Sequence, residues 1–557
     1  YGQNIMRFFD AEYNRKQLDE ELMLYRSLLG IDPAGVTAFW PPERVWDTER
    51  MAPVLRDRRL LNGGYCCVIL DDRTLLSPRD PSLPRELFDE GKQWAAEVFQ
   101  SHEIENGQGL IALPIATRLR RSIPPKEEED WRCVQRELEA LLVHSGGAGP
   151  GSLLALYADD MEKVIGVWGA DGPTRYAAFL EWVSTNDWVQ AVKLADWVAA
   201  NRPAGTRPIE PGTFAELAVE FDAGEAYDKW FHSDAWRPYR EHFEWAARRV
   251  KECKAAGGDP ALIELAEKQL LVSNWETAWH TPATGAHGDP LDHGKPSPWA
   301  RALTSHSRHA AVTAEAACWK GRRDGSAHVE TIDVDHDGEP DLVLKNECFF
   351  ALVSARWGGR IVSLFDIEGE RGAMVIGNPC DDWNFLEDLN RYMETPRNHP
   401  GAFADVGFEN DEYGCEVVSE GPVAVVRLTN VEAESAARGL VKLFEFRADA
   451  RGLTVRYELP PAITRFSVEC ALSPDYLTLL RCGSDAVQSF GNGPVRGFAA
   501  GEAAVAMELG AAVSWEAPVQ PWAGHAKTLR FGSSARTFEI TLRIESRAGA
   551  ASVEEAA

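Results

Sequence analysis

The sequence contains no apolar run approaching the roughly 18 to 20 residues that cross a bilayer, and its first residues lack the basic, apolar and small-residue succession of a secretory signal. Basic residues are also scarce, since 58 Lys and Arg stand against 86 Asp and Glu and leave a formal net charge of -28. Such a chain repels phosphate backbones and anionic lipid surfaces. We therefore expect neither nucleic acid nor a membrane as a partner.

Cysteine is sparse as well, with 10 residues in a chain of 557. This is not the dense spacing of a small disulfide framework, and it favours a reducing compartment, so the expected location is cytoplasmic. The first residue is Tyr1 rather than methionine, so a leader upstream stays an open alternative. Homo-oligomer formation is compatible with the sequence.

The pattern of apolar residues changes twice along the chain and predicts an α/β fold, then helices, then an all-β fold. Residues 1–185 combine short apolar runs with amphipathic stretches, as strand and helix units on a parallel sheet do. Residues 186–325 are predicted to be a helical domain, residues 326–547 a β-sandwich and residues 548–557 a disordered tail. The expected strands of the first region are 36–40, 65–70, 110–115 and 153–157, its expected helices are 15–29, 50–61, 84–101 and 127–144, and three expected sandwich strands are 424–430, 453–459 and 537–545.

Acidic residues follow several of the expected strands, where parallel α/β folds carry their chemistry. Glu43 follows the first expected strand, Asp71 and Asp72 the second, and Asp160 the fourth. Two carboxylates on separate strand ends can divide the work of glycosidic cleavage, one attacking the sugar carbon and the other protonating the leaving oxygen. Glu43 and Asp160 are the best-placed pair, although their position alone favours two solvated loop acids.

The residues around these two carboxylates are more specific than their positions. Glu43 begins the sequence Glu-Arg-Val-Trp, and Asp160 lies in a Tyr-Ala-Asp-Asp-Met-Glu-Lys run that continues to Gly-Val-Trp at Trp168. This pattern resembles glycoside hydrolase family 57, a group of retaining α-amylases and 4-α-glucanotransferases. The resemblance implies that Glu43 is the nucleophile of a covalent glycosyl-enzyme and that Asp160 is the general acid and then base. It continues, best for the glucanotransferase branch, at residues 67–72, 113–124, 279–280, 333–338 and 356–359.

The resemblance also implies an incomplete (β/α)7 barrel, a helical bundle and a C-terminal β-sandwich, in the same order as the periodicity. Family members begin with a strand that carries a His-Gln-Pro motif, and no such motif precedes Glu43. Four expected strands cannot close a barrel, so we expect the barrel to be truncated at its N-terminus. Whether this chain alone turns over substrate therefore stays open.

Four further residues are candidates for contact with substrate. Trp46 and Trp168 follow the two acids closely and offer aromatic faces for sugar rings, with core packing as the alternative. Asp72 is expected to orient the acids or a sugar, with a solvated or salt-bridged role as the alternative. His280 matches a Trp-His of the family and is expected to bind the sugar, unless it is a residue of the long loop 280–298.

A structural calcium site is predicted well away from the chemistry, where aspartates alternate along a short segment. The spacing Asp-x-Asp-x-Asp-Gly-x-x-Asp places oxygen ligands as calcium requires, and an acidic turn is the alternative. The expected ligands are Asp333, Asp335, Asp337 and Asp341. No cofactor is expected for catalysis.

These observations predict a retaining enzyme that acts on α-1,4-glucans or maltooligosaccharides, with transfer favoured over hydrolysis. One alternative is a catalytically inactive carbohydrate-binding or scaffold relative. Another is a metal-dependent deacetylase or mannosidase on a related barrel, which would require zinc at a cluster of Asp and His residues.

Overall fold

The structure of the chain, a computed structural model, forms two compact units. The first comprises Tyr1–Trp236 with Asn274–His280, and the second Arg237–Ser273 with Thr281–Ala557. No helix among the described residues is long and apolar enough to span a membrane. The described residues are 4–76, 96–144, 153–160, 170–213, 237–274, 298–334, 336, 338, 340–377, 401–472, 487–500, 503–517 and 527–546.

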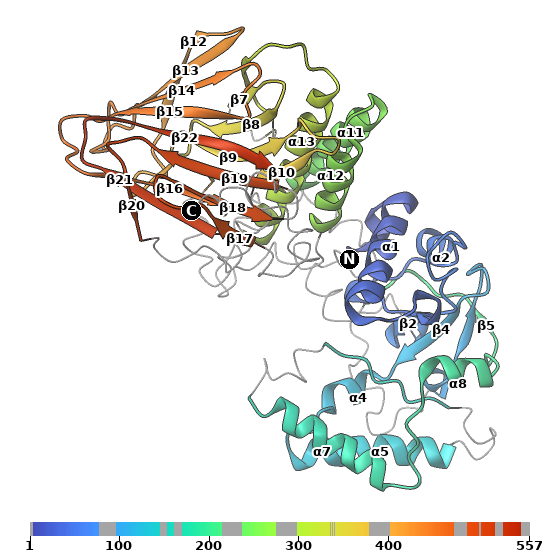
Figure 1. The fold of residues 1–557 in the computed structure, drawn as a ribbon. Coiled ribbons are helices and arrows are strands. Elements are labelled where there is room, and N and C mark those ends of the chain that lie inside the picture. The colour runs from blue at the N-terminus through green and yellow to red at the C-terminus, as the bar shows by residue number, and fades with distance from the viewer. Residues whose placement is uncertain are drawn as a thin grey trace. The chain divides into compact units, whose positions relative to one another are not determined.

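The first unit is built on a five-stranded sheet in the order β1-β2-β4-β3-β5 (Figure 1). Neighbours β1, β2 and β4 are parallel, whereas β3 runs antiparallel to β4 and parallel to β5. The region is therefore mixed α/β, as predicted. The bounds are β1 Ala38–Phe39, β2 Cys67–Asp71, β3 His102–Ile104, β4 Ile111–Ile115 and β5 Thr206–Arg207.

Three of the four strands expected in this region are confirmed as β1, β2 and β4. The fourth, at residues 153–157, is wrong, because the segment forms no strand ladder. It runs past the end of β4 with single hydrogen bonds, from Leu154 N–H to Phe99 O at 2.8 Å and from Ala116 N–H to Leu156 O at 2.9 Å. The strands β3 and β5 were not expected, since each is too short to show an apolar pattern.

The helices of the first unit begin and end at recognisable capping residues. Asp10 accepts the Tyr13 N–H at the start of α1, and Gly30 ends that helix with a φ of 66°. Asp47 caps α2 in the same way through Arg50 N–H. Helices expected at 15–29, 50–61 and 127–144 are present as α1, a shorter α2 and α5, whereas most of 84–101 lies outside the described residues. The bounds are α1 Ala11–Leu29, α2 Thr48–Leu55, α3 Arg73–Leu76, α4 Thr117–Ser122, α5 Glu128–His144, α7 Gly172–Thr185 and α8 Leu194–Ala200.

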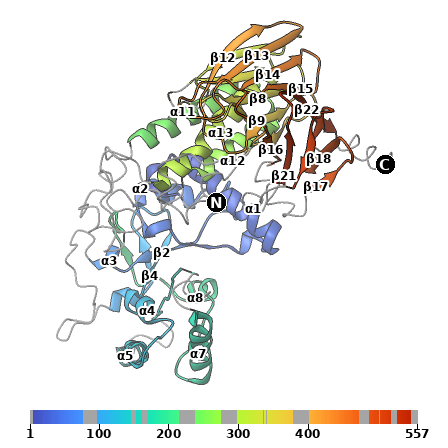
Figure 2. The same cartoon turned by 90° about the vertical axis from the view of Figure 1, so that its left-hand side faces the viewer.

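The second unit stacks helices, a five-stranded sheet and an eight-stranded sheet. Strand β8 of the five-stranded sheet is buried on both faces, as a strand between two layers is. Phe350 and Leu352 pack with the helices, whereas Phe349 and Val353 pack with the eight-stranded sheet. Helix α13 contacts β8, and helix α12 contacts β10 (Figures 1 and 2). The bounds are α11 Arg237–Ala255, α12 Pro260–Val272, α13 Pro298–Lys320, β6 His328–Ile332, β7 Asp341–Lys345, β8 Phe349–Ser354, β9 Arg360–Asp366 and β10 Ala373–Ile376.

This layering differs from the predicted domain boundaries. Helices α11 to α13 share a core with the five-stranded sheet of β6 to β10, so they do not form a separate domain over 186–325. Residues up to 236 instead belong with the first unit, where β5 extends the sheet. Composition alone could not reveal this, because a helix face that packs on a sheet has the same apolar stripe as one that packs on helices.

The remaining strands form antiparallel sheets, as the alternating pattern predicted. The eight-stranded sheet has the order β12-β13-β14-β15-β22-β19-β18-β17 and the four-stranded sheet the order β11-β16-β21-β20. The three quoted sandwich strands are confirmed as β13, β15 and β22. The bounds are β11 Ala404–Asp405, β12 Tyr413–Ser419, β13 Val423–Asn430, β14 Val441–Arg447, β15 Gly452–Glu458, β16 Phe466–Leu472, β17 Val487–Phe490, β18 Val495–Ala500, β19 Ala503–Leu509, β20 Ser514–Glu516, β21 Lys527–Ser533 and β22 Thr537–Ser546. The predicted tail at 548–557 lies outside the described residues.

A fully buried ion pair lies within this β region. Lys442 Nζ is 2.8 Å from Asp405 Oδ2, and both side chains are inaccessible to solvent. Tyr413 donates its hydroxyl to the same carboxylate at 2.5 Å. Burial raises the pKa of Asp405 and lowers the pKa of Lys442, and each charge opposes the shift of the other. The ammonium group also donates to the carbonyl oxygens of Gly358, Gly359 and Phe403.

Replacing Lys442 by methionine should therefore be strongly destabilising, because it leaves the Asp405 carboxylate buried without a counter-charge. We expect the free energy of unfolding to fall by about 3–5 kcal/mol, measured by chemical denaturation followed by circular dichroism. Arg427→Met is the matched control, since the Arg427 side chain is 40% exposed and its contact with Glu416 is as long as 4.0 Å, and it should cost less than about 1 kcal/mol. Equal losses in the two variants would contradict the role of the buried pair.

Candidate active site

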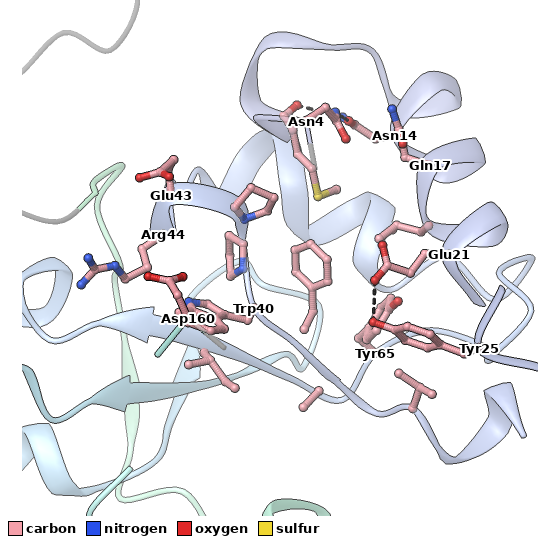
Figure 3. A pocket seen from close by; sticks show the side chains of 18 of the residues that line it. Asn4, Asn14, Gln17, Glu21, Tyr25, Trp40, Glu43, Arg44, Tyr65 and Asp160 are labelled. Atoms are coloured by element: carbon pink, nitrogen blue, oxygen red, sulfur yellow. Dashed lines mark hydrogen bonds between the residues drawn. The ribbon is translucent and has the colours of Figure 1, made fainter. Parts of the chain in front are cut away.

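A pocket of about 640 Å³ lies in the first unit beside β1 and α1 (Figure 3). Glu43 and Asp160 lie at one end of it, and Glu21 and Tyr25 of α1 lie at the other. The structure thus brings together in one pocket the two carboxylates that the sequence motifs single out.

Glu43 is held in the pocket by a turn of unusual backbone conformation. Its φ of 50° and that of Arg44, 52°, both lie in the left-handed region that residues with a Cβ rarely adopt. Contacts with the neighbouring residues 212 and 213 hold the turn. Thr213 donates its hydroxyl to Glu43 O at 2.5 Å, and Trp46 pairs with Gly212 through two backbone hydrogen bonds of 2.8 and 3.1 Å. Strained residues of this kind are concentrated at functional sites.

Arg44 also holds this turn in place through an ion pair. Its guanidinium Nη1 is 2.6 Å from Asp71 Oδ2, and both side chains are nearly inaccessible. Asp71 is the last residue of β2, so the ion pair fastens the loop after β1 to the end of the neighbouring parallel strand. Arg44 therefore pairs with Asp71, and its positive charge also opposes the rise in the pKa of Glu43.

Asp72, the next residue along the chain, binds in a different direction. Its Oδ1 accepts the Thr117 hydroxyl at 2.8 Å and its Oδ2 accepts the Thr117 N–H at 3.1 Å. Thr117 begins α4, so Asp72 anchors that helix to β2. Burial, and then the negative charge of Asp71, raise the pKa of Asp72 to about 7.

Asp160 is joined to α4 through Arg120. The guanidinium Nη2 of Arg120 lies 3.0 Å from Asp160 Oδ2 and 2.9 Å from Asp159 Oδ1. The side chain of Asp159 is only 2% exposed, whereas that of Asp160 is 57% exposed. Of these two aspartates, Asp160 is therefore the one that remains open to solvent.

The two candidate acids influence one another. Burial raises the pKa of Glu43 above its ordinary value, and the negative charge of Asp160 adds to this shift, while Arg44 and Arg120 oppose it. The two arginines therefore favour the ionised form of Glu43, whereas burial and the charge of Asp160 disfavour it.

Aromatic side chains line the pocket between its two ends. Phe39 and Tyr65 contact each other with ring centroids 5.4 Å apart, and Trp40 also lines the wall. Aromatic walls of this kind pack against the apolar faces of sugar rings. These residues were not among the predicted substrate contacts, although Phe39 and Trp40 end the first expected strand and so could have been considered.

The predicted substrate contacts have different outcomes. Trp46 is fully buried in the core, where its indole N–H donates to Thr48 Oγ1 at 2.9 Å, so its placement in the cleft was wrong. Asp72 is 4% exposed and does not line the pocket, so its contact is with Thr117 rather than with a ligand. Trp168 and His280 lie outside the described residues, and their roles stay predictions.

The calcium site also stays a prediction, because Asp335 and Asp337 lie outside the described residues. Of the other two expected ligands, Asp333 accepts the Gly338 N–H at 3.1 Å and Asp341 begins β7. Within the described parts of the chain, no group of three or more His, Cys, Asp or Glu residues is arranged to hold a metal ion.

Comparisons with known proteins identify distant relatives, although no family model matches the chain. It is 25% identical over 388 residues to the 4-alpha-glucanotransferase of Thermococcus kodakarensis, covering 64% of this chain and 50% of that protein. It is 24% identical over 400 residues to the alpha-amylase of Pyrococcus horikoshii, covering 66% of this chain and 54% of that protein. The chain spans about half the length of the curated relatives it matches.

Among solved structures, the 4-alpha-glucanotransferase from Thermococcus litoralis matches at 18% identity with a TM-score of 0.42, covering 97% of this chain and 86% of that one. A score this low carries no argument about the fold. The sequence matches confirm that the chain is distantly related to 4-α-glucanotransferases and α-amylases, the enzymes that the two motifs resemble.

The buried position of Trp46 leads to a prediction that separates core from cleft. Trp46→Ala should lower the free energy of unfolding by about 3–5 kcal/mol because it leaves a large cavity, and Trp46→Phe should lower it less while leaving glucan affinity unchanged. Denaturation followed by circular dichroism measures the first, and glucan titration the second. The control is Trp188→Phe, whose side chain is 39% exposed. A loss of affinity without a loss of stability would return Trp46 to the cleft.

The raised pKa of Asp72 leads to a prediction about stability and pH. The folded protein keeps the Asp72 proton up to about pH 7, whereas the unfolded chain releases it near the ordinary pKa of about 4. Between these values the folded state binds more protons, so this group's contribution to stability falls as the pH rises, by roughly 1.4 kcal/mol per unit of pKa shift.

Asp72→Asn mimics the protonated side chain at every pH and should remove this dependence. The two proteins should have similar melting temperatures near pH 4, and the variant should become the more stable one as the pH approaches 7. Differential scanning calorimetry across this range measures the difference. A constant difference between the two proteins at all pH values would contradict the assignment.

Proposed function

We propose that this chain carries the active site of a retaining enzyme on α-1,4-glucans, a 4-α-glucanotransferase or an α-amylase. The observation that supports the proposal is the convergence of Glu43 and Asp160, one from each sequence motif, at the same end of one pocket. Relatives named 4-alpha-glucanotransferase and alpha-amylase match the same chain. The proposed substrate is an α-glucan or a maltooligosaccharide.

The proposed reaction has two steps with a covalent intermediate. The Glu43 carboxylate forms a bond to the anomeric carbon as the glycosidic bond breaks, and Asp160 gives its proton to the departing oxygen. An acceptor hydroxyl then attacks the same carbon, Asp160 takes the acceptor's proton, and Glu43 leaves as a carboxylate. Two inversions at one carbon retain the α configuration. Such a mechanism requires carboxyl groups about 5–5.5 Å apart.

The charges around the pocket are consistent with a nucleophilic role for Glu43. A nucleophile must be ionised, and burial works against this by raising the pKa of Glu43. The positive charges of Arg44 and Arg120 work in the opposite direction. The buried ion pair with Asp71 holds the Arg44 guanidinium in place, so its positive charge stays close to Glu43.

Transfer and hydrolysis share the same intermediate and differ only in the acceptor. Transfer is proposed first because the motif resemblance is best for the glucanotransferase branch. The aromatic side chains of Phe39 and Trp40, which line the pocket, offer packing surface to a second sugar in preference to water. Chromatography of products from maltotriose distinguishes the two, since transfer gives longer oligosaccharides and hydrolysis gives shorter ones alone.

A second candidate is a carbohydrate-binding relative without turnover. The described sheet of the first unit supports it, because five strands of mixed direction do not close a barrel. This candidate predicts glucan binding by the chain without any change in oligosaccharide length.

The test of the first candidate is Glu43→Gln, which keeps the shape of the side chain and removes its nucleophilic charge. We expect turnover of maltooligosaccharides to fall on the order of 10³-fold or more with an unchanged melting temperature. Glu49→Gln, at an exposed position of α2, is the control and should retain full activity. NMR of the first product should show the α anomer. Retained activity in Glu43→Gln would remove Glu43 from the mechanism.

A further inference from the structure

Arg120 occupies a position between two carboxylates that differ sharply in their surroundings. One guanidinium nitrogen, Nη2, lies 2.9 Å from Asp159 and 3.0 Å from Asp160. Asp159 is fixed, because its side chain is buried and its Oδ1 also accepts the Asp160 N–H at 2.9 Å. Asp160 is half exposed and lines the pocket. The Arg120 guanidinium therefore binds both the buried Asp159 and Asp160, which lines the pocket.

We propose that Arg120 is a positioning residue that controls the proton on Asp160, holding it as a carboxylate when they are paired and remaining with Asp159 when Asp160 is protonated. This inference rests on the proposed function, in which Asp160 donates and then recovers one proton. Sequence reasoning placed no role on Arg120, because its pairing with residues 40 positions away depends on the fold.

Several charged and titratable groups of the described residues lie at this end of the pocket. Tyr157, beside Asp159, is neutral because burial and that carboxylate raise its pKa, and Asp72 binds its proton up to about pH 7. The remaining described charges that face the pair from the loop after β1, the end of β2, α4 and the segment before residue 161 are the cations Arg44 and Arg120 and the carboxylates Glu43, Asp71, Asp159 and Asp160.

The negative charge of Asp160 raises the pKa of Glu43. In the proposed reaction Glu43 is ionised while Asp160 carries the proton. The contact of Arg120 with Asp160 at 3.0 Å stabilises the ionised carboxylate, so it affects how readily Asp160 accepts that proton.

The geometry also fits the proton's movement during the reaction. When the glycosidic oxygen takes the proton, Asp160 regains a negative charge 3.0 Å from Arg120, which stabilises the developing charge. When the acceptor hydroxyl gives up its proton, Asp160 becomes neutral again and Arg120 keeps its contact with Asp159. Arg120 itself stays in place because α4 is anchored at Thr117 by both oxygens of Asp72.

The test is the pH profile of kcat/KM for a maltooligosaccharide. Arg120→Gln removes the cation, so Asp160 should hold its proton to higher pH and the alkaline limb should move up by about one pH unit. Asp159→Asn removes the buried carboxylate that also binds Arg120, so Arg120 should favour ionised Asp160 more strongly and the limb should move down. Arg120→Lys keeps the charge and should leave the limb near its original place.

The double variant separates a shared cation from two independent charge effects. With Arg120→Gln already present, Asp159→Asn should move the limb much less than it does alone, because coupling through one guanidinium is not additive. Arg132→Gln is the matched control, since it removes an arginine from a surface pair with Glu128 at 2.7 Å on α5 and should shift nothing. Additive shifts, or shifts of the same sign in the two single variants, would overturn the proposal.

A second measurement does not depend on turnover. Carbodiimide-dependent amidation of Asp160, followed by peptide mass spectrometry over a pH series, reports how readily this carboxyl binds a proton. Arg120→Gln should move the labelling profile up and Asp159→Asn should move it down. If the unmodified protein shows no glucan turnover, the proposed function fails and the labelling still decides the role of Arg120. Unchanged labelling in both variants would overturn the role of Arg120 even in an active enzyme.

Discussion

The candidate site depends on two adjacent aspartates at the end of β2 that bind different parts of the chain. Asp71 holds Arg44 in the loop that carries Glu43, and Asp72 holds Thr117 at the start of the helix that carries Arg120. Neighbouring residues of an extended strand point to opposite sides, so one short sequence can anchor both. The positions of the two candidate acids therefore trace back to a single strand end.

This arrangement carries an energetic cost that the surrounding contacts offset. Asp72 is buried beside another carboxylate, and its raised pKa shows that its ionised form is disfavoured there. Glu43 and Arg44 adopt left-handed backbone conformations, which cost roughly 1–2 kcal/mol each for residues with a Cβ. The left-handed turn places Glu43 in the pocket and Asp72 anchors the helix that carries Arg120, which is the usual exchange of stability for function.

The sequence was sufficient for features that are local and failed where distant segments decide. Strands β2 and β4 are buried apolar runs, and the motifs located Glu43 and Asp160 without any knowledge of the fold. Trp46 was misplaced because nearness to Glu43 along the chain suggested a shared cleft, whereas the left-handed turn directs the following residues into the core. Arg120 could not be found, since its partners come from a segment that forms no strand. The boundary of the helical region was wrong because β8 is buried on both faces, a property that alternation does not reveal.

Different interactions stabilise the interior of each unit. This difference determines where a substitution can change function without loss of the fold. Every residue assigned to the proposed chemistry lies in the first unit, where buried charges are shared among loops and strand ends. In the second unit the buried charge of Lys442 is compensated by Asp405 and backbone carbonyls, within a continuous apolar core. Substitutions at the buried pair of Lys442 and Asp405 should therefore act on stability. Substitutions around Asp71 and Asp72 should alter stability and protonation together, because the same carboxylates set both.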